Sequence, residues 1–600
     1  MNKLSRVLTG LCAVALCACS SDEPMQGDGG QQIPAGPTGD TAYLAIDICD
    51  ANEIGRGSDG GFEYGVDEQA VSNAYFYFYD ESGLFVSEAN LWNPGKPGAD
   101  DENIEYFGEN TVVLNGLTGK KFPSYVVTVL NRPEVFTPGA TLDEMGKIII
   151  DSYKSGNNFI MTTTSWRGDA DDHSDKYYFA TKLQDKNFFN ELPTKEDITN
   201  DRRMEIYVER LAVKVRVKMS LKNESIEKNG KTLYKLSLTA AGKPNAGTGN
   251  GDTTADTDLY VSFEGWALNS TAKSTNLMKS LEGLTASTSV DGWDKWNMAA
   301  LHRSYWGKAT TYGLAGDALK AAFNTPVNYT QLTNEIGGAT YCMENTNKAD
   351  NISQDGLIVP SKTTSVLLKA VVCDVNGNPL DLVTYQGLTF VKDRFVDYIM
   401  AAVNPQYFTR VLVGNESDYN EENPITDANY NYTGITVTDV TLAAAGHGTG
   451  SVNVALTDEA AAKEWYTVEM GDDGKVAKAI KVTAKDVNDR LASATPATNK
   501  AVAATTGATY YPIAIEHLNT PAAGQTGVIT AQYGVVRNHC YDIVISEVKA
   551  LGEGVFKPGN IPGEDPEPLI PEDPKDPKYY VGARINILSW KIVNQGVVLD

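Results

Sequence analysis

The stretch that decides the fold class is the last one, YYVGARINILSWKIVNQGVVLD, residues 579–600. From Tyr579 to Ile587 apolar residues alternate with polar or small ones, and this period of two predicts a β-strand. The apolar positions then change parity at Leu588, Trp590 and Ile592. A strand this apolar needs a sheet to pair with, and the many Thr, Val, Tyr and Gly residues elsewhere favour an all-β chain.

The segment before this strand, residues 558–578, carries a proline every two to four positions: Pro558, Pro562, Pro566, Pro568, Pro571, Pro574 and Pro577. Proline fixes φ and removes a backbone donor, so we expect an extended, semi-rigid spacer. A strand on a spacer either folds back onto its own domain or reaches into another molecule. We expect residues 579–600 to be donated to a neighbour, and the sequence leaves open whether they first rest on their own domain.

Composition narrows the function classes. A chain of 600 residues is long enough for two or more domains with ample cores. Its net charge of −26 argues against nucleic acid and against an anionic membrane surface as electrostatic partners. Beyond the N-terminus no apolar run is long enough to span a bilayer.

The N-terminus, residues 1–18, is predicted to be a lipoprotein signal peptide. Lys3 and Arg6 precede an apolar run that ends in Leu16-Cys17-Ala18-Cys19, which resembles a bacterial lipobox. This pattern implies cleavage after Ala18 and diacylation of Cys19; an ordinary secretory signal with incidental cysteines is the alternative. Residues 19–40, rich in Gly, Pro, Gln and Asp, are predicted to be a flexible linker.

The first strand after the linker spans residues 42–48, where Leu44, Ile46 and Ile48 form one apolar face. It runs into a Gly/Ser/Asp-rich loop, residues 54–61, that a protease can enter. Arg56 in this loop is the one Lys or Arg between Arg6 and Lys96. It is either a processing site for an Arg-specific protease, which would cut between Arg56 and Gly57, or a solvated arginine without a role.

Further along, residues 71–86 predict a hairpin around the turn 80–83. Thr141 and Glu144 predict a capped helix within residues 141–153, and one strand is expected over residues 203–219. A polar break near residue 223 divides the predicted N-terminal domain, 57–222, from the C-terminal domain, 223–557. In the second domain Asp317 is expected to cap a short helix over 317–323, and the Ala-rich residues 457–505 are expected to form a partly helical insertion.

No catalytic, metal or cofactor site is predicted. Cys49, Cys342, Cys373 and Cys540 lack CxxC spacing, and one disulfide among them is left open. His539 and Cys540 are adjacent on a strand, where side chains point to opposite faces, so they do not form a catalytic pair. The acidic residues 169–175 lack the Gly and Glu of an EF-hand, and Gly446-His447-Gly448-Thr449-Gly450 lacks the ending of a phosphate loop. We expect the latter to be a hairpin turn.

Several stretches together resemble the fimbrillin superfamily, and within it the shaft subunits of Mfa-type minor fimbriae (type V pili). In chain order they are AYFYFYDESGLFV from Ala74, VERLAVKVRV over 208–217, GWALN over 265–269, residues 510–517, VRNHCYDIVI over 536–545, and the proline spacer with the last strand. Each match is weak alone, but their order is specific and spans nearly all of the mature chain. The Ala-rich stretch 457–505 has no counterpart in this pattern.

The resemblance implies two transthyretin-like β-sandwich domains with a C-terminal donor-strand extension. It also implies a lipoprotein precursor at the outer membrane that an Arg-specific protease cuts at Arg56. Residues 41–56 then leave, and the vacated groove takes the donor strand of an identical subunit, with Ile585, Ile587, Leu588, Trp590, Ile592 and Val593 as its apolar side chains. Head-to-tail contacts of this kind propagate as a filament rather than closing.

The expected function is therefore that of the polymerising shaft subunit of an extracellular fimbrium that supports adhesion and biofilm formation alongside accessory subunits. Two alternatives remain. A monomeric glycan-binding surface lipoprotein would keep its first strand and cluster exposed aromatic residues. An anchor or tip subunit of the same pilus would keep that strand or dispense with the donor strand. An enzyme would need a carboxylate pair or metal cluster that the sequence does not offer.

Overall fold

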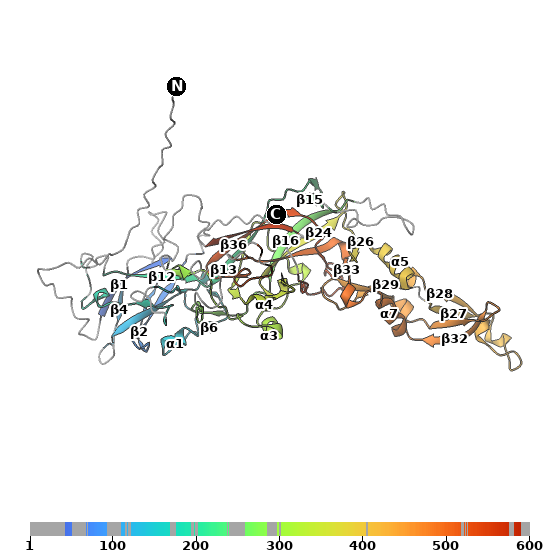
Figure 1. Ribbon diagram of the computed structural model, residues 1–600, viewed down its shortest axis with the longest axis horizontal. Helices are drawn as coiled ribbons and strands as arrows, with labels where there is room; N and C mark the ends of the chain where they lie inside the picture. Colours follow the sequence, from blue (N-terminus) through green and yellow to red (C-terminus); the bar gives the residue numbers. More distant parts are fainter. Residues whose placement is uncertain are drawn as a thin grey trace, which may run out of the picture.

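The computed structural model describes residues 42–50, 68, 70–92, 110–114, 117, 122–168, 176–191, 193, 197, 202–236, 238, 258–284, 297–298, 302–403, 406–517, 521, 524, 526–574 and 581–589. For residues 45–50, 91–92, 110–113, 297–298 and 581–589 the description covers the backbone alone. Three units lie in a row along the long axis: an N-terminal domain, a C-terminal domain, and an inserted module at the far end (Figure 1). Strands dominate each of the first two units, which confirms the all-β class.

The N-terminal domain is built on a nine-stranded sheet of order β11-β1-β12-β9-β5-β2-β3, with β10 paired to β5 and β4 paired to β1. Its strands are β1 (Ala42–Asp50), β2 (Asn73–Asp80), β3 (Phe85–Trp92), β4 (Asn110–Leu114), β5 (Pro123–Leu130), β9 (Met161–Thr163), β10 (Thr181–Lys182), β11 (Phe188–Phe189) and β12 (Met204–Arg210). The predicted hairpin is confirmed as β2 and β3, with Gly83 at φ +82° in its turn. Strand β2 buries both faces, Phe76 and Phe78 on one and Tyr77 and Tyr79 on the other.

The C-terminal domain is a sandwich of two sheets. One has the order β20-β13-β36-β38 and the other β14-β15-β16-β24-β34-β37. The strands are β13 (Ala212–Met219), β14 (Ser225–Lys228), β15 (Lys231–Lys235), β16 (Tyr260–Asn269), β20 (Ala339–Met343), β24 (Ser365–Cys373), β34 (Ala508–Ala514), β36 (His539–Val548), β37 (Glu553–Gly554) and β38 (Val581–Ser589). Apolar residues of both sheets, including Val215, Trp266, Leu368 and Ile543, share one core.

The strand expected over residues 203–219 is two strands, because β12 pairs within the N-terminal sheet whereas β13 pairs with β20 and β36. The chain changes domain at Leu211, which is fully buried and therefore leaves no polar break in the sequence. The break near residue 223 lies after this change, between β13 and the β14–β15 hairpin. The domain boundary predicted from the polar break therefore lies about ten residues after the position where the chain changes domain.

The inserted module takes the place of a hairpin turn, since its neighbours β24 and β34 pair directly through Val371 and Ala508. Its main sheet has the order β26-β25-β33-β30-β29, and a second, four-stranded sheet β28-β27-β31-β32 forms the far end. The elements are β25 (Leu382–Tyr385), β26 (Leu388–Val391), α5 (Lys392–Val403), β27 (Phe408–Leu412), β28 (Tyr430–Gly434), β29 (Val440–Ala444), β30 (Ser451–Leu456), α6 (Asp458–Ala461), β31 (Trp465–Met470), β32 (Val476–Val482), α7 (Ala484–Ala492) and β33 (Ala501–Ala504).

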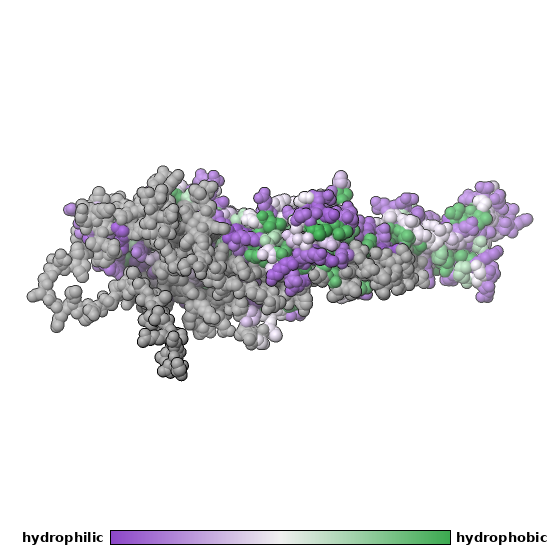
Figure 2. Space-filling view, turned by 90° about the horizontal axis from the view of Figure 1, so that it is seen from above, coloured by the Kyte–Doolittle hydropathy of each residue, from purple (hydrophilic) through white to green (hydrophobic). Residues whose placement is uncertain are grey.

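Helices α5 and α7 cover the main sheet of the module and give it a core of its own. The partly helical insertion expected at 457–505 is thus the second half of a larger module that begins after Cys373. The far end exposes Val411, Met470 and Ile480 among charged residues (Figure 2). The start of this module could not be predicted from the sequence, because its strands have the same composition as those of the sandwich.

Two helices differ from their predictions in length or in the capping residue. Helix α1 (Leu142–Met145) is capped by Thr141, whose side chain accepts from the Glu144 amide as expected, but it has four residues and gives way to β6 (Ile149–Ile150). Helix α3 (Gly316–Ala321) begins one residue before the predicted range 317–323 and ends two residues before it. Ala315 is its N-cap residue, so Asp317 lies in the first turn instead. There its carboxylate still faces the positive end of the helix dipole.

The remaining short elements are β7 (Lys154–Ser155), β8 (Asn158–Phe159), β17 (Thr275–Asn276), β18 (Asn297–Met298), β19 (Arg303–Ser304), β21 (Asn345–Thr346), β22 (Ser353–Gln354), β23 (Leu357–Ile358), β35 (Gly534–Val535) and α4 (Ala349–Ile352). In the described residues no helix is long and apolar enough to cross a membrane.

Candidate functional site

Strand β1, predicted as the displaced strand, lies inside the N-terminal sheet. Its residues Ala42–Ile46 pair antiparallel with β4, and Ile46–Asp50 pair in parallel with β12. The side chains of Ala42 and Leu44 are fully buried in the core that β2, β5 and β12 share. Ile46 lies opposite Met204 and Ile48 opposite Ile206 along the ladder. Removing β1 would leave unpaired N–H and C=O groups on both neighbouring strands and an open apolar site at Leu44.

The chain is held again soon after the predicted processing loop. Arg56 and Gly57 lie outside the described residues, as do Ala18 and Cys19. Glu68, which follows the loop, is buried: its carboxylate accepts from Lys214 Nζ at 2.8 Å and from the Tyr341 hydroxyl, and its carbonyl accepts from Arg210 Nε at 3.1 Å. These contacts fix Glu68 to β12, β13 and β20 independently of β1.

The place that β1 occupies in the sheet is here called the groove. Strand β12 forms its wall on the side opposite β4, and β12 is held by the C-terminal domain. Glu209 on β12 forms a fully buried ion pair with Lys279 at 2.7 Å, and Lys279 also donates to the Ser304 carbonyl. Burial lowers the pKa of Lys279, while Glu209 opposes that shift. A second buried pair, Arg537 with Glu344 at 3.2 Å, lies in the same interface, where Arg537 also donates to the Leu277 carbonyl. Strand β12 is therefore tied to the neighbouring domain from the side away from the groove.

The predicted donor strand is seen on its own domain. Strand β38 pairs antiparallel with β36 at the edge of the sandwich, with Ile587 opposite Tyr541 and Ile585 opposite Ile543. The sequence left open whether this strand rests on its own domain before assembly, and in the structure it does. Leu588 pairs with Cys540, whereas Trp590, Ile592 and Val593 lie outside the described residues. An edge strand separates from a sheet by breaking one ladder, which a central strand cannot do.

The sequence missed how the proline-rich tail behaves. Residues 555–574 pack along the C-terminal domain and the inserted module instead of standing free. The extended spacer predicted from residue 558 is wrong for its first part, because the Glu567 amide donates to the Lys557 carbonyl at 3.0 Å and closes residues 557–567 into a loop. Leu569 is fully buried beside Tyr329 and Tyr510. The signal was present as Pro568-Leu569-Ile570-Pro571, an apolar pair within a polar, proline-rich segment. A spacer that stays in water has no need of two large apolar residues.

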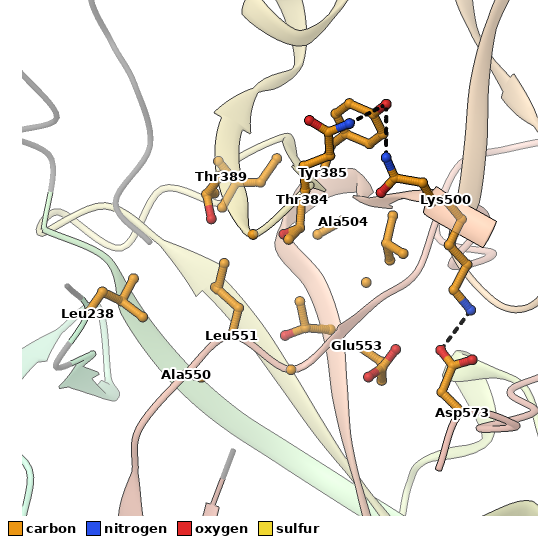
Figure 3. A pocket seen from close by; sticks show the side chains of 18 of the residues that line it. Leu238, Thr384, Tyr385, Thr389, Lys500, Ala504, Ala550, Leu551, Glu553 and Asp573 are labelled. Carbon is orange, nitrogen blue, oxygen red and sulfur yellow. Dashed lines mark hydrogen bonds and ion pairs between the residues drawn. The ribbon is translucent and has the colours of Figure 1, made fainter. Parts of the chain in front are cut away.

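A cavity of about 490 Å3 opens at the root of the inserted module (Figure 3). Its floor is apolar, with Leu382, Ala504 and Leu551, and its rim carries Tyr385 and the ion pair of Lys500 with Asp573 at 2.7 Å. The Tyr385 hydroxyl donates to the Ala494 carbonyl and accepts from Gln386 at 3.0 Å. Among the described residues no group of three or more His, Cys, Asp or Glu side chains is arranged to hold a metal ion.

The side chains of His539 and Cys540 on β36 are buried in the protein interior. Burial raises the pKa of the Cys540 thiol to about 12 and lowers the pKa of His539 well below its ordinary value, so both groups are neutral near pH 7. Neither is therefore activated for nucleophilic chemistry. Cys342, Cys373 and Cys540 are free thiols, so the disulfide that the sequence left open is not formed among these three.

Residues 504–596 match the family model described as "Major fimbrial subunit protein type IV, Fimbrillin, C-terminal". No curated protein matches the chain.

Among solved structures, the fimbrilin FimA from Porphyromonas gingivalis W83 is 12% identical, with 92% of this chain and 98% of that chain covered and a TM-score of 0.33. A proposed cell adhesion protein from Parabacteroides distasonis is 11% identical, with 92% and 98% covered and a TM-score of 0.36. The tip fimbrial protein Mfa3 from P. gingivalis is 12% identical, with 58% and 83% covered and a TM-score of 0.24. Superpositions at this level define neither the fold nor the function of this chain.

The segment matched by the family model runs from the end of β33 through β34 and β36 to β38, and so includes both the predicted donor strand and β36, with which that strand pairs. The resemblance to the fimbrillins that the sequence indicates is thus confirmed for the C-terminal part of the chain.

Proposed function

We propose that this chain is the shaft subunit of a cell-surface fimbria that polymerises by strand exchange. In this proposal the precursor is anchored in the outer membrane through a lipid on Cys19, is cut after Arg56, and loses residues 41–56. Strand β38 of an identical subunit then enters the vacated site. The fimbrillin family supports a role as a fimbrial subunit outside the cell, and a family of structural subunits argues for a non-enzymatic role.

The observation that carries the proposal is the placement of β1. A buried strand that pairs on both sides is joined to the rest of the chain through a loop that contains Arg56, and the chain beyond the loop is held by Glu68. A cut in that loop separates β1 from a domain in which β12, β9, β5, β2 and β3 keep their ladders with one another, while β4 and β11 lose their pairing with β1. The groove wall β12 stays in position through the buried Glu209–Lys279 pair.

The two strands also share a pattern. Ala42, Leu44 and Ile46 alternate with polar or small residues, and Ala583, Ile585 and Ile587 do the same. If the donor strand takes this register, Ala583 occupies the fully enclosed site of Ala42 and Ile585 that of Leu44. A β-branched side chain of equal size replaces a leucine there, so the apolar area buried in the precursor is restored in the filament.

The test is processing in solution. Precursor lacking its signal peptide is cut with an Arg-specific protease, and ladders on gels and filaments in micrographs are expected. Arg56→Ala and a deletion of residues 579–600 are run beside it, and each should stay monomeric. Polymerisation of both variants at the parent's rate would refute the proposal. A retained first strand in native filaments would instead favour an anchor subunit.

A further inference from the structure

The glycine-rich hairpin Gly446–Gly450 holds the C-terminal tail. Thr449 at its tip donates from Oγ1 to the Pro568 carbonyl at 3.1 Å and accepts from the Ile570 amide at 2.9 Å. The Gly450 amide donates to Glu567 Oε1 at 3.1 Å. Gly450 has φ +69°, and a Cβ there would lie 2.1 Å from the Gly554 carbonyl oxygen, so only glycine lets the loop approach this closely. Gly450 thus lets the hairpin pack against β37, and from this position Thr449 and Gly450 reach the tail.

The C-terminal domain contacts the other side of the same segment. The Leu569 amide donates to the Val327 carbonyl at 2.8 Å, and the Leu569 side chain is fully buried. Pro571 is buried, and its carbonyl accepts from the Ser361 amide at 3.2 Å. Residues 567–573, here termed the docked tail, are therefore gripped between two units of the chain.

The docked tail ends at an ion pair. Asp573 lies 2.7 Å from Lys500 on the rim of the cavity at the module's root (Figure 3). Neighbouring Glu572 pairs with Lys320 at 3.0 Å, where both side chains are about half exposed and add little stability. Beyond this point the chain reaches β38 at Val581.

We propose that the inserted module is a clamp that sets the reach of the C-terminal strand. With residues 567–573 held, the tether that carries β38 starts at Pro574. Val581 lies eight residues beyond Asp573, and a fully extended chain over those eight steps spans at most roughly 26–29 Å. If the tail were free from Phe556 onward, the same strand would reach roughly 80–90 Å.

The consequence rests on the proposed function. A donor strand on the shorter tether can enter only a groove that begins within that distance of Asp573. The N-terminal domain of the next subunit must then lie beside the root of the inserted module. The clamp thereby limits the relative positions that two subunits can take, and it reduces the entropy lost when the strand is captured.

Hydrogen exchange on the unprocessed monomer tests the clamp without reference to polymerisation. In Thr449→Val the Ile570 amide loses its acceptor and the Pro568 carbonyl its donor, so the amides of Leu569 and Ile570 should exchange roughly tenfold faster or more. Thr433→Val, an exposed position on β28 of the same module, should leave them unchanged. Equal exchange over residues 565–573 in parent and Thr449→Val would overturn the proposal, as would an equal rise in Thr433→Val. The peptides of β24 and β34 report whether either variant disturbs the sandwich.

A second experiment tests the reach in the filament. Deleting residues 575–577 shortens the tether and should abolish ladders after processing. Adding Thr449→Val, Leu569→Ala and Asp573→Asn to the deletion, which weakens the contacts to both units, should restore them, because the opened tail supplies the missing length. Polymerisation of the deletion variant alone, or failure of the combined variant, would contradict the reach limit. If the parent itself stays monomeric, the proposed function fails while the exchange measurement still decides the clamp.

Discussion

Replacing Leu44 by alanine should lower the stability of the precursor and leave the stability of the filament unchanged. Leu44 is fully buried in the N-terminal core and is paired between β4 and β11. Leucine-to-alanine changes at such sites cost about 2–5 kcal/mol, from lost transfer free energy and the cavity left behind. For a domain of roughly 150 residues each kcal/mol lowers the melting temperature by about 2–4 °C, so the precursor should melt about 4–20 °C lower.

The assay compares two forms of the same variant. Thermal unfolding of the uncut precursor should show the loss, whereas guanidinium disassembly of processed filaments should match the parent, because β1 has left the subunit. Leu84→Ala, at a 52% exposed turn position, should change the precursor by no more than about 0.5 kcal/mol. Filaments of Leu44→Ala that disassemble at lower denaturant than the parent would show that β1 is retained, and the reasoning would be refuted.

Three further outcomes follow from the buried groups. Gly83→Ala should destabilise the precursor by about 1–3 kcal/mol in denaturant titrations, because φ is +82° and the new Cβ would lie 2.6 Å from the Tyr177 hydroxyl. Lys279→Met should cost about 3–5 kcal/mol by leaving Glu209 buried without its partner, and Lys279→Met with Glu209→Gln should recover part of the loss in the same titration. Burial lowers the pKa of His517 to about 3, so the folded state binds fewer protons than the unfolded state below about pH 6.5. Stability should fall by up to about 1.4 kcal/mol per pH unit between pH 6.5 and 3, and His517→Gln should flatten that slope in titrations at pH 7 and 5.

The strands at the two ends of the chain were predictable because each alternates cleanly. In β1 and β38 a period of two is undisturbed by turn residues, and the hairpin of β2 and β3 is marked by its Asp-Glu-Ser-Gly turn. The position at which the chain passes from the N-terminal to the C-terminal domain, Leu211, was not predictable. Strands β12 and β13 form one unbroken apolar and charged pattern, and only tertiary pairing separates them.

The contacts of the candidate site were harder to foresee. Glu209 and Lys279 are 70 residues apart and sit among ordinary strand and loop residues, so nothing local marks them as partners. The motif Gly446–Gly450 was predicted to be a turn, and it joins β29 to β30 as a turn. Its contact with Glu567 and Pro568 depends on two segments more than one hundred residues apart, which no periodicity encodes.

Photo-crosslinking from position 585 tests strand exchange most directly. A photoreactive residue replaces Ile585, the protein is processed and polymerised, and isotope-labelled and unlabelled subunits are mixed so that mass spectrometry separates links between chains from links within one. In the unprocessed monomer the links should fall on β36 around Ile543, where β38 is paired. After polymerisation they should move to β4, β11 or β12 of a different subunit. Links that stay on β36 of the same chain in assembled filaments would contradict the account.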